Sequence, residues 1–180
     1  MPEDFLKIYR KYYNDNPTLL ATVLSHSESV ARKALEIVGR KGLHVDRYFI
    51  YSAALLHDIG VVRCDAPSIF CYGHLPYICH GITGKKILEK EGLYRHAMIC
   101  ERHTGSGLSV QQIVSQNLPL PVHDMLPLSI EEKLICYADK FFSKSGDLAR
   151  EKPLDIVMRQ MAAHGEEALE RFKALHNKFS

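Results

Sequence analysis

Six side chains of types that bind transition metals lie on apolar faces of segments that are far apart in the sequence. Two of them, His57 and Asp58, are adjacent and follow the apolar run at 53–56. The other four are His26, His80, His103 and Asp139. A buried carboxylate costs several kcal/mol unless a cation neutralises it. One shared metal centre therefore explains the six better than six separate hydrogen-bonded core residues, or carboxylates paired with Lys or Arg, although such a structural network remains the alternative.

The ligand types indicate which ions such a centre would bind. Neutral imidazole and carboxylate, with no cysteine at the corresponding positions, favour iron, manganese, cobalt or zinc over calcium. Six protein ligands are more than one ion can use while it still binds a substrate. Two ions can share them if the Asp58 carboxylate bridges the pair, so we expect a site for two divalent transition-metal ions.

Helices must position these residues, because helical periodicity occurs in nearly every segment and the alternation typical of strands is hard to find. We expect an all-α fold, a compact bundle of about six to eight helices. The first helices are predicted from Pro2 to about residue 14, from Thr18 to Val38, and from an N-cap at Asp46 to Gly60. Further helices are expected from His80, from about Leu93, from Ser109, from Ser129, and on both sides of Gly165.

Proposed ligands fall within the apolar stripes of these helices. They and their stripe neighbours are His26 with Val23 and Val30, His57 with Ala53, His80 with Gly84 and Ile87, His103 with Ile99, and Asp139 with Ile135 and Phe142. Residues 61–79, with Pro67, Gly73 and Pro76, are predicted to form a long loop that covers the site. Its aromatic residues Phe70, Tyr72 and Tyr77 either stack on a base or pack the loop.

Composition limits the class of protein. With 180 residues, 46% hydrophobic and 24% charged, the chain is predicted to be one domain, 1–180, with its core at 20–145 and a helical extension at 153–180. Five cysteines without a CxxC pair, no leader and no apolar run long enough for a bilayer favour a cytoplasmic protein without membrane contact. A net charge of +2 in mixed-sign stretches argues against a duplex nucleic acid partner. An apolar C-terminal helix suits a homodimer.

The sequence resembles the HD superfamily of metal-dependent phosphohydrolases, in particular its HDIG subgroup. His57-Asp58-Ile59-Gly60 carries the resemblance, which covers roughly residues 20 to 145. It implies that His26, His57, Asp58 and Asp139 bind a first metal ion and that His80 and His103 bind a second. Cyclic dinucleotide phosphodiesterases of the HD-GYP type and symmetric diadenosine tetraphosphate hydrolases share the six-ligand pattern.

Two departures argue against cyclic dinucleotide cleavage. Val61 replaces the lysine that usually follows HDIG, and the stretch at 105–108 lacks a Tyr-Pro ending. The region from Glu101 to Asp139 is most similar to stand-alone HDIG proteins of unassigned substrate. The resemblance thus implies a phosphohydrolase that cleaves a phosphate ester of a nucleotide or another small molecule by a metal-activated hydroxide.

Basic residues near the proposed ligands are candidates to contact substrate phosphate, since they balance its negative charge. They are Arg63, Lys85, Arg102 and Lys140, of which Lys85 has charged neighbours typical of a solvated face. With Asp58, we assign catalytic roles to Arg63, Arg102 and Lys140. His74, in the predicted loop, is a candidate proton donor to the leaving group, unless it is simply exposed.

Two other functions remain open at this point. Oxygenases of the same superfamily use a di-iron centre with this ligand set to activate oxygen. A catalytically silent domain that binds a nucleotide or a metal is the third interpretation, although a pure binding module has no need for open metal positions.

Overall fold

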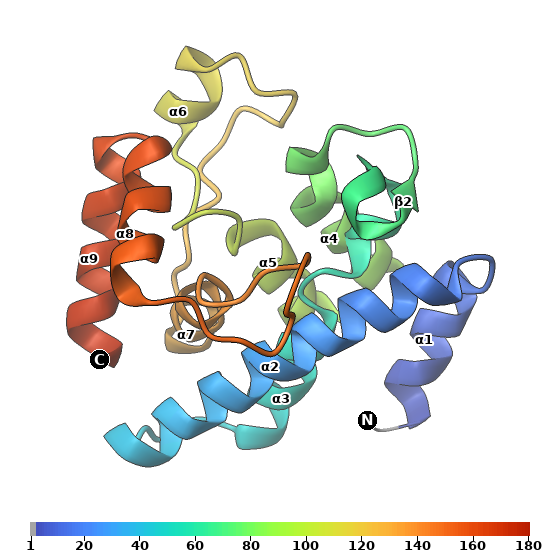
Figure 1. Ribbon diagram of the computed structural model, residues 1–180, viewed down its shortest axis with the longest axis horizontal. Helices are drawn as coiled ribbons and strands as arrows, with labels where there is room; N and C mark the ends of the chain where they lie inside the picture. Colours follow the sequence, from blue (N-terminus) through green and yellow to red (C-terminus); the bar gives the residue numbers. More distant parts are fainter. Residues whose placement is uncertain (1–2) are drawn as a thin grey trace.

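The computed structural model describes residues 3–180 and confirms the all-α fold. Nine α-helices lie in this part of the chain, one more than the upper end of the expected range (Figure 1). They are α1 (Glu3–Tyr13), α2 (Pro17–Lys41), α3 (Arg47–Leu56), α4 (His80–Lys90), α5 (Tyr94–Arg102), α6 (Val110–Ser115), α7 (Ile130–Asp139), α8 (Leu154–Ala163) and α9 (Glu166–Phe179). The predicted start of the first helix at Pro2 lies outside the described residues.

Helix α2 is the longest, and local chemistry sets both of its ends. The side chain of Asn16 accepts a hydrogen bond from the Leu19 amide at 2.9 Å, and Pro17 occupies the first turn. The helix continues to Lys41, three residues beyond the predicted end, because Gly42 adopts the left-handed conformation (φ 60°) that closes it. Gly39 therefore lies within the helix.

Helix α3 begins as predicted but ends earlier. The Asp46 side chain accepts a hydrogen bond from the Phe49 amide at 3.0 Å, which confirms it as the N-cap. The helix ends at Leu56 and not at Gly60, because Asp58 leaves helical geometry (φ −106°, ψ 11°) and a 3₁₀ helix, η1 (Ile59–Arg63), follows. His57 and Asp58 thus lie at the bend between two helical segments.

Residues 61–79 are not the long irregular loop that we predicted. They contain the end of η1, strand β1 (Asp65–Ala66), η2 (Pro67–Ile69), strand β2 (Cys71–Tyr72) and η3 (Tyr77–Cys79), with β1 and β2 antiparallel. Ile69 and Cys71 are buried, and the Cys71 thiol lies 2.8 Å from the carbonyl oxygen of Cys64. Elements of two to five residues are too short to show a periodicity, which is why the sequence did not reveal them.

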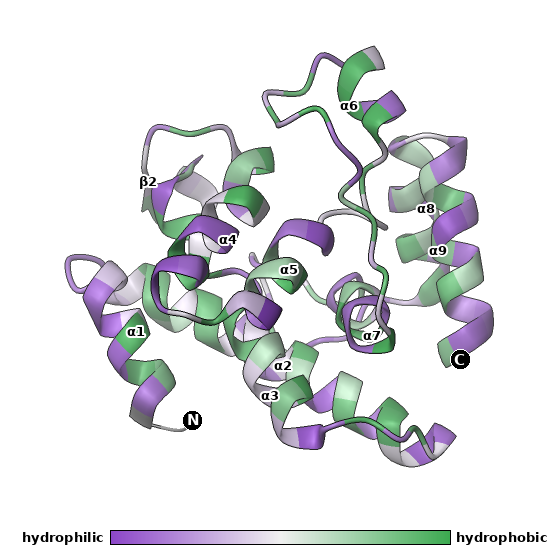
Figure 2. Cartoon of the chain, turned by 180° about the vertical axis from the view of Figure 1, so that it is seen from behind, coloured by the Kyte–Doolittle hydropathy of each residue, from purple (hydrophilic) through white to green (hydrophobic). Residues whose placement is uncertain are grey.

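The hydrophobic core consists of two clusters. One is formed by the C-terminal half of α2 with α3, α7, α8 and α9, and the other by α1, the N-terminal half of α2, η1, the short hairpin and α4, while α5 contributes to both. Figure 2 shows α1, α8 and α9 striped with hydrophilic and hydrophobic residues, as amphipathic helices are. On α2, Val23 belongs to one cluster and Val30 to the other, so His26 lies at the boundary between them.

The C-terminal helices pack within the chain. Phe172 and Phe179 of α9 are fully buried, and the ring of Tyr137 on α7 stacks on Phe172 with 5.6 Å between ring centroids. The apolar stripe of α9, on which we based the expectation of a homodimer, is thus largely used inside the monomer. Within residues 3–180, no helix is long and apolar enough to cross a membrane.

Candidate metal centre

The six predicted ligands come together where the two hydrophobic clusters meet. His26 lies on α2, His57 and Asp58 at the bend after α3, His80 at the first residue of α4, His103 directly after α5, and Asp139 at the last residue of α7. All six side chains are buried. Ligand atoms of His26, His57, Asp58 and Asp139 lie within 4.8 Å of one another, and so do those of Asp58, His80 and His103.

Close packing of two glycines brings His80 to Asp58. A Cβ atom on Gly60 would lie 2.1 Å from the carbonyl oxygen of His80 and 2.3 Å from the amide nitrogen of Gly84. Only glycine lets η1 and α4 approach this closely. The fourth residue of the His57-Asp58-Ile59-Gly60 motif therefore has a packing role that positions a ligand from another helix.

Asp58 lies at the centre of the cluster. Each of its two carboxylate oxygens lies near the Nε2 atoms of two histidines. Its Oδ2 is 3.1 Å from Nε2 of His57 and 3.3 Å from Nε2 of His26. Its Oδ1 is 3.4 Å from Nε2 of His103 and 3.5 Å from Nε2 of His80. The two oxygens thus face two different groups of ligands, as a bridging carboxylate would.

Backbone carbonyls fix the orientation of three of the rings. Nδ1 of His57 lies 2.6 Å from the Ala54 oxygen, Nδ1 of His80 lies 2.7 Å from the Tyr77 oxygen, and Nδ1 of His103 lies 2.8 Å from the Cys100 oxygen. Because a carbonyl only accepts, each Nδ1 must carry the proton and donate it. A neutral ring then presents an unprotonated Nε2 to the centre, the form that binds a metal.

Nε2 of His80 and Nε2 of His103 face each other at 3.0 Å. Both rings donate through Nδ1, so in their neutral forms two lone pairs point at the same space. Burial lowers the pKa of His80 to about 3 and also lowers the pKa of His103, which keeps both rings neutral. A cation between or beside the two nitrogens would satisfy both lone pairs.

Charges at the centre favour the forms that bind metal ions. Burial alone would raise the pKa values of Asp58 and Asp139, but His57 and Lys144 near Asp58, and Lys140 and Lys144 near Asp139, hold both well below the usual range. Burial opposes protonation of His57, yet the two carboxylates outweigh it and raise the pKa of His57 to about 9. A metal ion at His57 would therefore replace a proton.

Atoms without hydrogen-bond partners provide the test of whether a metal fits. Among the buried atoms of the described residues that form no hydrogen bond of acceptable geometry are Nδ1 of His26, Nε2 of His57 and both carboxylate oxygens of Asp58. Buried polar atoms are rarely left unsatisfied in native proteins. The donor set of four imidazoles and two carboxylates suits a divalent transition-metal ion, so the residues fit a metal centre.

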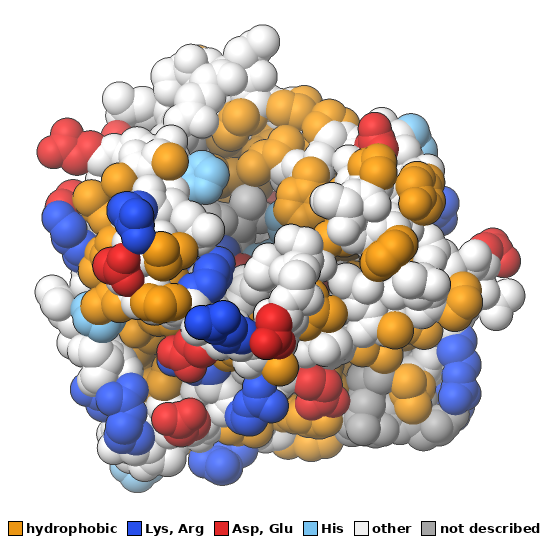
Figure 3. All heavy atoms as spheres, in the orientation of Figure 1, with side chains coloured by type: hydrophobic (Ala, Val, Ile, Leu, Met, Phe, Trp, Pro, Cys, Tyr) orange, Lys and Arg blue, Asp and Glu red, His pale blue; other side chains and the backbone are white. Residues whose placement is uncertain are grey.

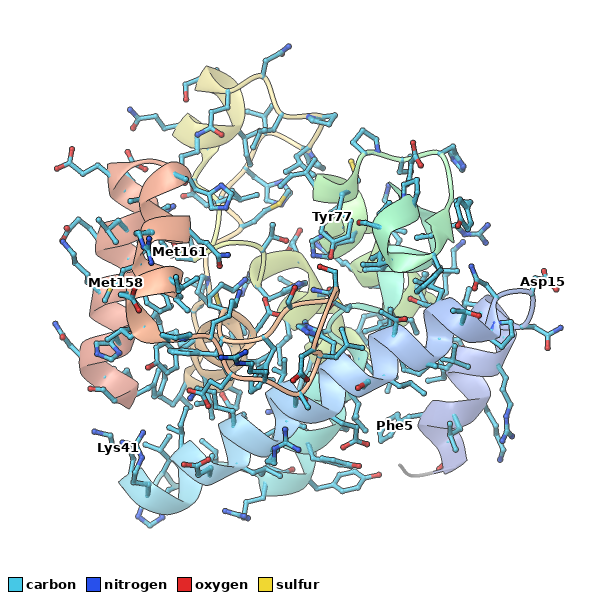
Figure 4. The ribbon with its side chains drawn as sticks, viewed as in Figure 1. Phe5, Asp15, Lys41, Tyr77, Met158 and Met161 are labelled. Carbon is cyan, nitrogen blue, oxygen red and sulfur yellow. The ribbon has the colours of Figure 1, made fainter. Side chains whose placement is uncertain are left out.

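A cavity of about 640 Å³ opens beside this cluster, and His80, His103 and Asp139 form part of its wall. Tyr77 and Met161, which also line it, come from η3 and α8 on opposite sides (Figure 4). Figure 3 shows this face of the molecule hollowed near its middle, with hydrophobic side chains above the hollow and basic ones below it. The volume is in the range of small-molecule binding sites.

Of the predicted phosphate contacts, the structure brings Lys140 to the centre and leaves Lys85 and Arg102 outside it. Nζ of Lys140 lies 2.6 Å from Oδ2 of Asp139, and the residue lines the cavity. Nζ of Lys85 instead pairs with Glu101 at 2.7 Å, and Arg102 pairs with Glu132 at 3.0 Å. Neither of these two residues lines the cavity.

Arg63 and His74 lie elsewhere. Both line a second depression of about 340 Å³, together with residues of α1 and the start of α2 such as Tyr12 and Leu19. Within the predicted covering loop, only its last part, with Tyr77 and Ile78, borders the cavity of the metal ligands. Phe70 and Tyr72 are exposed outside it.

Lys144 is the residue of the site that the sequence did not reveal. Its Nζ lies 2.7 Å from Oδ2 of Asp58 and 4.0 Å from Oδ1 of Asp139, and it lines the cavity. The residue follows α7 in an irregular segment, where no periodicity marks a buried position. Its five-residue separation from Asp139 was the one available signal.

Comparison with known proteins decides the family. Residues 23–143 match the family model described as HD domain. The chain belongs to the HD domain family. This confirms the resemblance stated above, and the metal-ligand cluster lies within the matched part of the HD domain. No solved structure matches the chain significantly.

Three curated proteins are similar to this HD domain chain. Two are named tRNA (cytidine(56)-2'-O)-methyltransferase: one of Picrophilus torridus, 31% identical over 88% of this chain and 41% of the relative, and one of Thermoplasma volcanium, 30% identical over 88% and 42%. The third is an uncharacterized protein of Methanocaldococcus jannaschii, 34% identical over 65% of this chain and 64% of the relative. The chain thus spans about two fifths of the length of the two named methyltransferases.

Proposed function

We propose that this HD domain chain is a metal-dependent phosphohydrolase that uses two divalent ions to cleave a phosphate ester of a nucleotide or another small molecule. The observation that carries the proposal is the convergence of four Nε2 atoms on the two oxygens of Asp58 at 3.1–3.5 Å. Divalent ions bound there would activate water and polarise phosphoryl oxygens. Iron, manganese, cobalt and zinc all suit this donor set.

The residues of the chain itself have separate tasks in this proposal. Three backbone carbonyls keep His57, His80 and His103 in the tautomer that binds metal. Lys140 and Lys144 balance the charges of Asp139 and Asp58, and both line the cavity. Their ammonium groups are placed to contact the anionic oxygens of a phosphate bound beside the ligands.

The names of two relatives bear on the substrate. They describe methylation of a tRNA, for whole proteins of which this chain matches about two fifths. We propose phosphate hydrolysis and not methyl transfer for this chain, since the cavity borders the metal-ligand cluster. Because those relatives are named for tRNA, the substrate panel should include phosphorylated RNA ends beside free nucleotides.

Metal content and hydrolysis, measured on the same samples, test the proposal. Wild-type protein purified without chelator is compared with Asp58→Ala and with Asp65→Ala, which removes an exposed carboxylate of β1. We expect about two ions per chain in wild type and Asp65→Ala, a large loss in Asp58→Ala, and hydrolysis that follows metal content. Hydrolysis is assayed without oxygen, so that an oxygenase cannot form the product. Oxygen uptake, which would identify a di-iron oxygenase, is measured in a separate aerobic assay.

Two results would contradict the proposal. Metal-loaded protein that hydrolyses no member of a broad panel would favour the silent binding domain. Protein that takes up none of the four metals would instead make the buried histidines and aspartates a structural network.

A further inference from the structure

The connection between α7 and α8 brings three lysines to the wall of the cavity, and they differ in their partners. Lys140 pairs with Asp139 at 2.6 Å and also donates to the carbonyl oxygen of His103 at 3.0 Å, whereas Lys144 pairs with Asp58 at 2.7 Å. Lys152 donates to Gln160 Oε1 at 3.0 Å, a neutral acceptor. Among the residues that the structure describes, no carboxylate pairs with Lys152.

The cavity therefore has more positive than negative charge along this wall. Asp139 lines this wall, and Asp58 pairs with Lys144 without lining it, so two carboxylates balance three ammonium groups. Divalent ions at the centre would add to the excess of positive charge. Burial lowers the pKa of Lys152; Asp139 opposes this shift, and the charges of Lys140 and Lys144 reinforce it. A half-buried cation without a counter-ion destabilises the protein unless a ligand brings the missing negative charge.

Lys152 lies further from the ligands than the other two lysines do, and it lines the same cavity. Lys140 and Lys144 contact metal-ligand side chains directly, whereas the side-chain partner of Lys152 is Gln160 on α8. Beside Gln160, the wall continues with Met161 and His164. The cavity of about 640 Å³ thus extends from the metal ligands past Lys152 to α8 and has room for more than one phosphoryl group.

We propose that Lys152 binds a second phosphate of the substrate, so that the site takes compounds with two linked phosphates, such as a nucleoside diphosphate. The phosphate to be cleaved would lie at the metal ligands and Lys144, and its neighbour at Lys152, which Gln160 holds toward the cavity. This inference rests on the proposed function. Lys152 and α8 lie beyond residues 23–143, the part that matches the HD domain model, so this specificity would come from the C-terminal extension.

Binding of two probes that cannot be hydrolysed tests the inference. Methylphosphonate carries one phosphoryl group and methylenediphosphonate carries two, and calorimetry gives their affinities for metal-loaded wild type, Lys152→Met and Lys173→Met. Lys173 lies on the outer part of α9 and pairs with Glu170, so its loss changes the net charge equally without touching the cavity. Metal content is measured before and after each titration, because a diphosphonate also chelates free ions.

We expect wild type and Lys173→Met to prefer the diphosphonate, and Lys152→Met to bind it about tenfold more weakly, the effect of one charge-assisted hydrogen bond. The affinity of Lys152→Met for methylphosphonate should differ from that of wild type by less than about twofold. Equal weakening of both probes, or no preference in metal-loaded wild type, would overturn this inference alone. Failure of wild type to bind metal or either probe would overturn the proposed function as well.

Discussion

Two buried carboxylates, Glu101 and Asp58, have neighbours of different kinds. Glu101, 3% exposed, has Nζ of Lys85 at 2.7 Å and Nε2 of His123 at 3.0 Å from its Oε1, and Nε of Arg102 at 3.9 Å from its Oε2. Asp58, fully buried, has Lys144 on Oδ2, but the neutral rings of His80 and His103 turn acceptor nitrogens toward its Oδ1. The first arrangement is complete as a protein network. A cation would complete the second.

The comparison shows why a buried acidic residue alone does not identify a metal site. Both groups contain histidine, carboxylate and lysine at hydrogen-bond distances. What differs is the other nitrogen of each ring, because backbone carbonyls occupy Nδ1 of His80 and His103 and leave Nε2 without a proton. At Glu101, the Nε2 atom of His123 lies 3.0 Å from Oε1 and can donate to it.

The largest expected effect separates the two carboxylates by function. Asp58→Asn should remove metal and lower phosphohydrolase turnover at least about 1,000-fold, since the loss of a bridging ligand removes several kcal/mol of transition-state stabilisation. Glu101→Gln should retain its metal and stay within about threefold of wild type. Elemental analysis with initial rates on the best substrate checks both. Loss of metal in Glu101→Gln would mean that the two groups form one site.

Unlike turnover, the stability of the protein should depend on Glu101. Glu101→Gln leaves Lys85 without its counter-ion and weakens the contact with His123. It should reduce the free energy of unfolding by about 2–3 kcal/mol, somewhat less than for a fully buried pair because Lys85 and His123 are partly exposed. Urea unfolding of Glu101→Gln, Lys85→Met and the double variant measures the coupling. A change in Glu101→Gln below about 0.5 kcal/mol, typical of surface substitutions, would contradict a structural role for this network.

Added metal should stabilise the protein through Asp58 and not through Glu101. A divalent ion at about 100 times its dissociation constant stabilises the native state by about 2.7 kcal/mol, which corresponds to roughly 5–10 °C in Tm for a chain of this size. Differential scanning calorimetry of chelator-treated protein, with and without metal, should show this shift in wild type and in Glu101→Gln. A shift of equal size in Asp58→Asn would place the ion elsewhere.

The sequence predicted the site residues that lie in or next to helices and missed those in irregular segments. The ligands lie in or directly next to helices, where a 3.6-residue period marks the inner face, so His26 between Val23 and Val30 was recognisable. Lys144 and Lys152 lie in the irregular connection after α7, where no period exists. Pairing partners were equally out of reach, since Glu101 and Lys85 are on different helices.

The fold prediction succeeded where the signal is local in sequence, and it failed where contacts between distant residues decide the structure. Side-chain caps at Asp46 and Ser109 begin helices α3 and α6 as expected, because the cap and its hydrogen bonds are local in sequence. After the bend that ends α3, Gly60 packs against Gly84, a contact between distant residues that the sequence does not mark. Such contacts also order the hairpin at 65–72, which has no local signal.

A partly buried histidine, His96, gives a smaller, pH-dependent effect on stability. Among residues 3–180, no carboxylate and no predicted metal ligand pairs with His96, which lies against Phe49 and Ser52. Burial, with the charge of Arg95, lowers the pKa of His96 to about 4. Since an unfolded histidine has a pKa near 6.5, the unfolded state binds the proton more readily, and stability present above about pH 6.5 is lost as the pH falls toward 4.

The His96→Gln variant isolates this contribution. Compared with wild type, it should lose less stability between pH 7 and pH 4.5, by on the order of 1 kcal/mol after allowance for partial exposure. Chelator-treated protein is used, so that proton competition at the metal ligands is the same in both. Parallel pH profiles for the two proteins would show that His96 is not protonated on unfolding in this range.

The smallest effects are expected at Arg63 and His74, which the sequence suggested as catalytic and the structure places in a second depression. Neither residue lines the cavity of the metal ligands, so Arg63→Ala and His74→Ala should keep their metal and slow turnover by less than about threefold. Lys144→Ala, measured beside them, should slow it far more because its ammonium contacts Asp58 at 2.7 Å. A tenfold or larger loss in His74→Ala with full metal content would mean that the segment at 64–76 moves over the cavity when substrate binds. In that case the hairpin would be the element that closes the site.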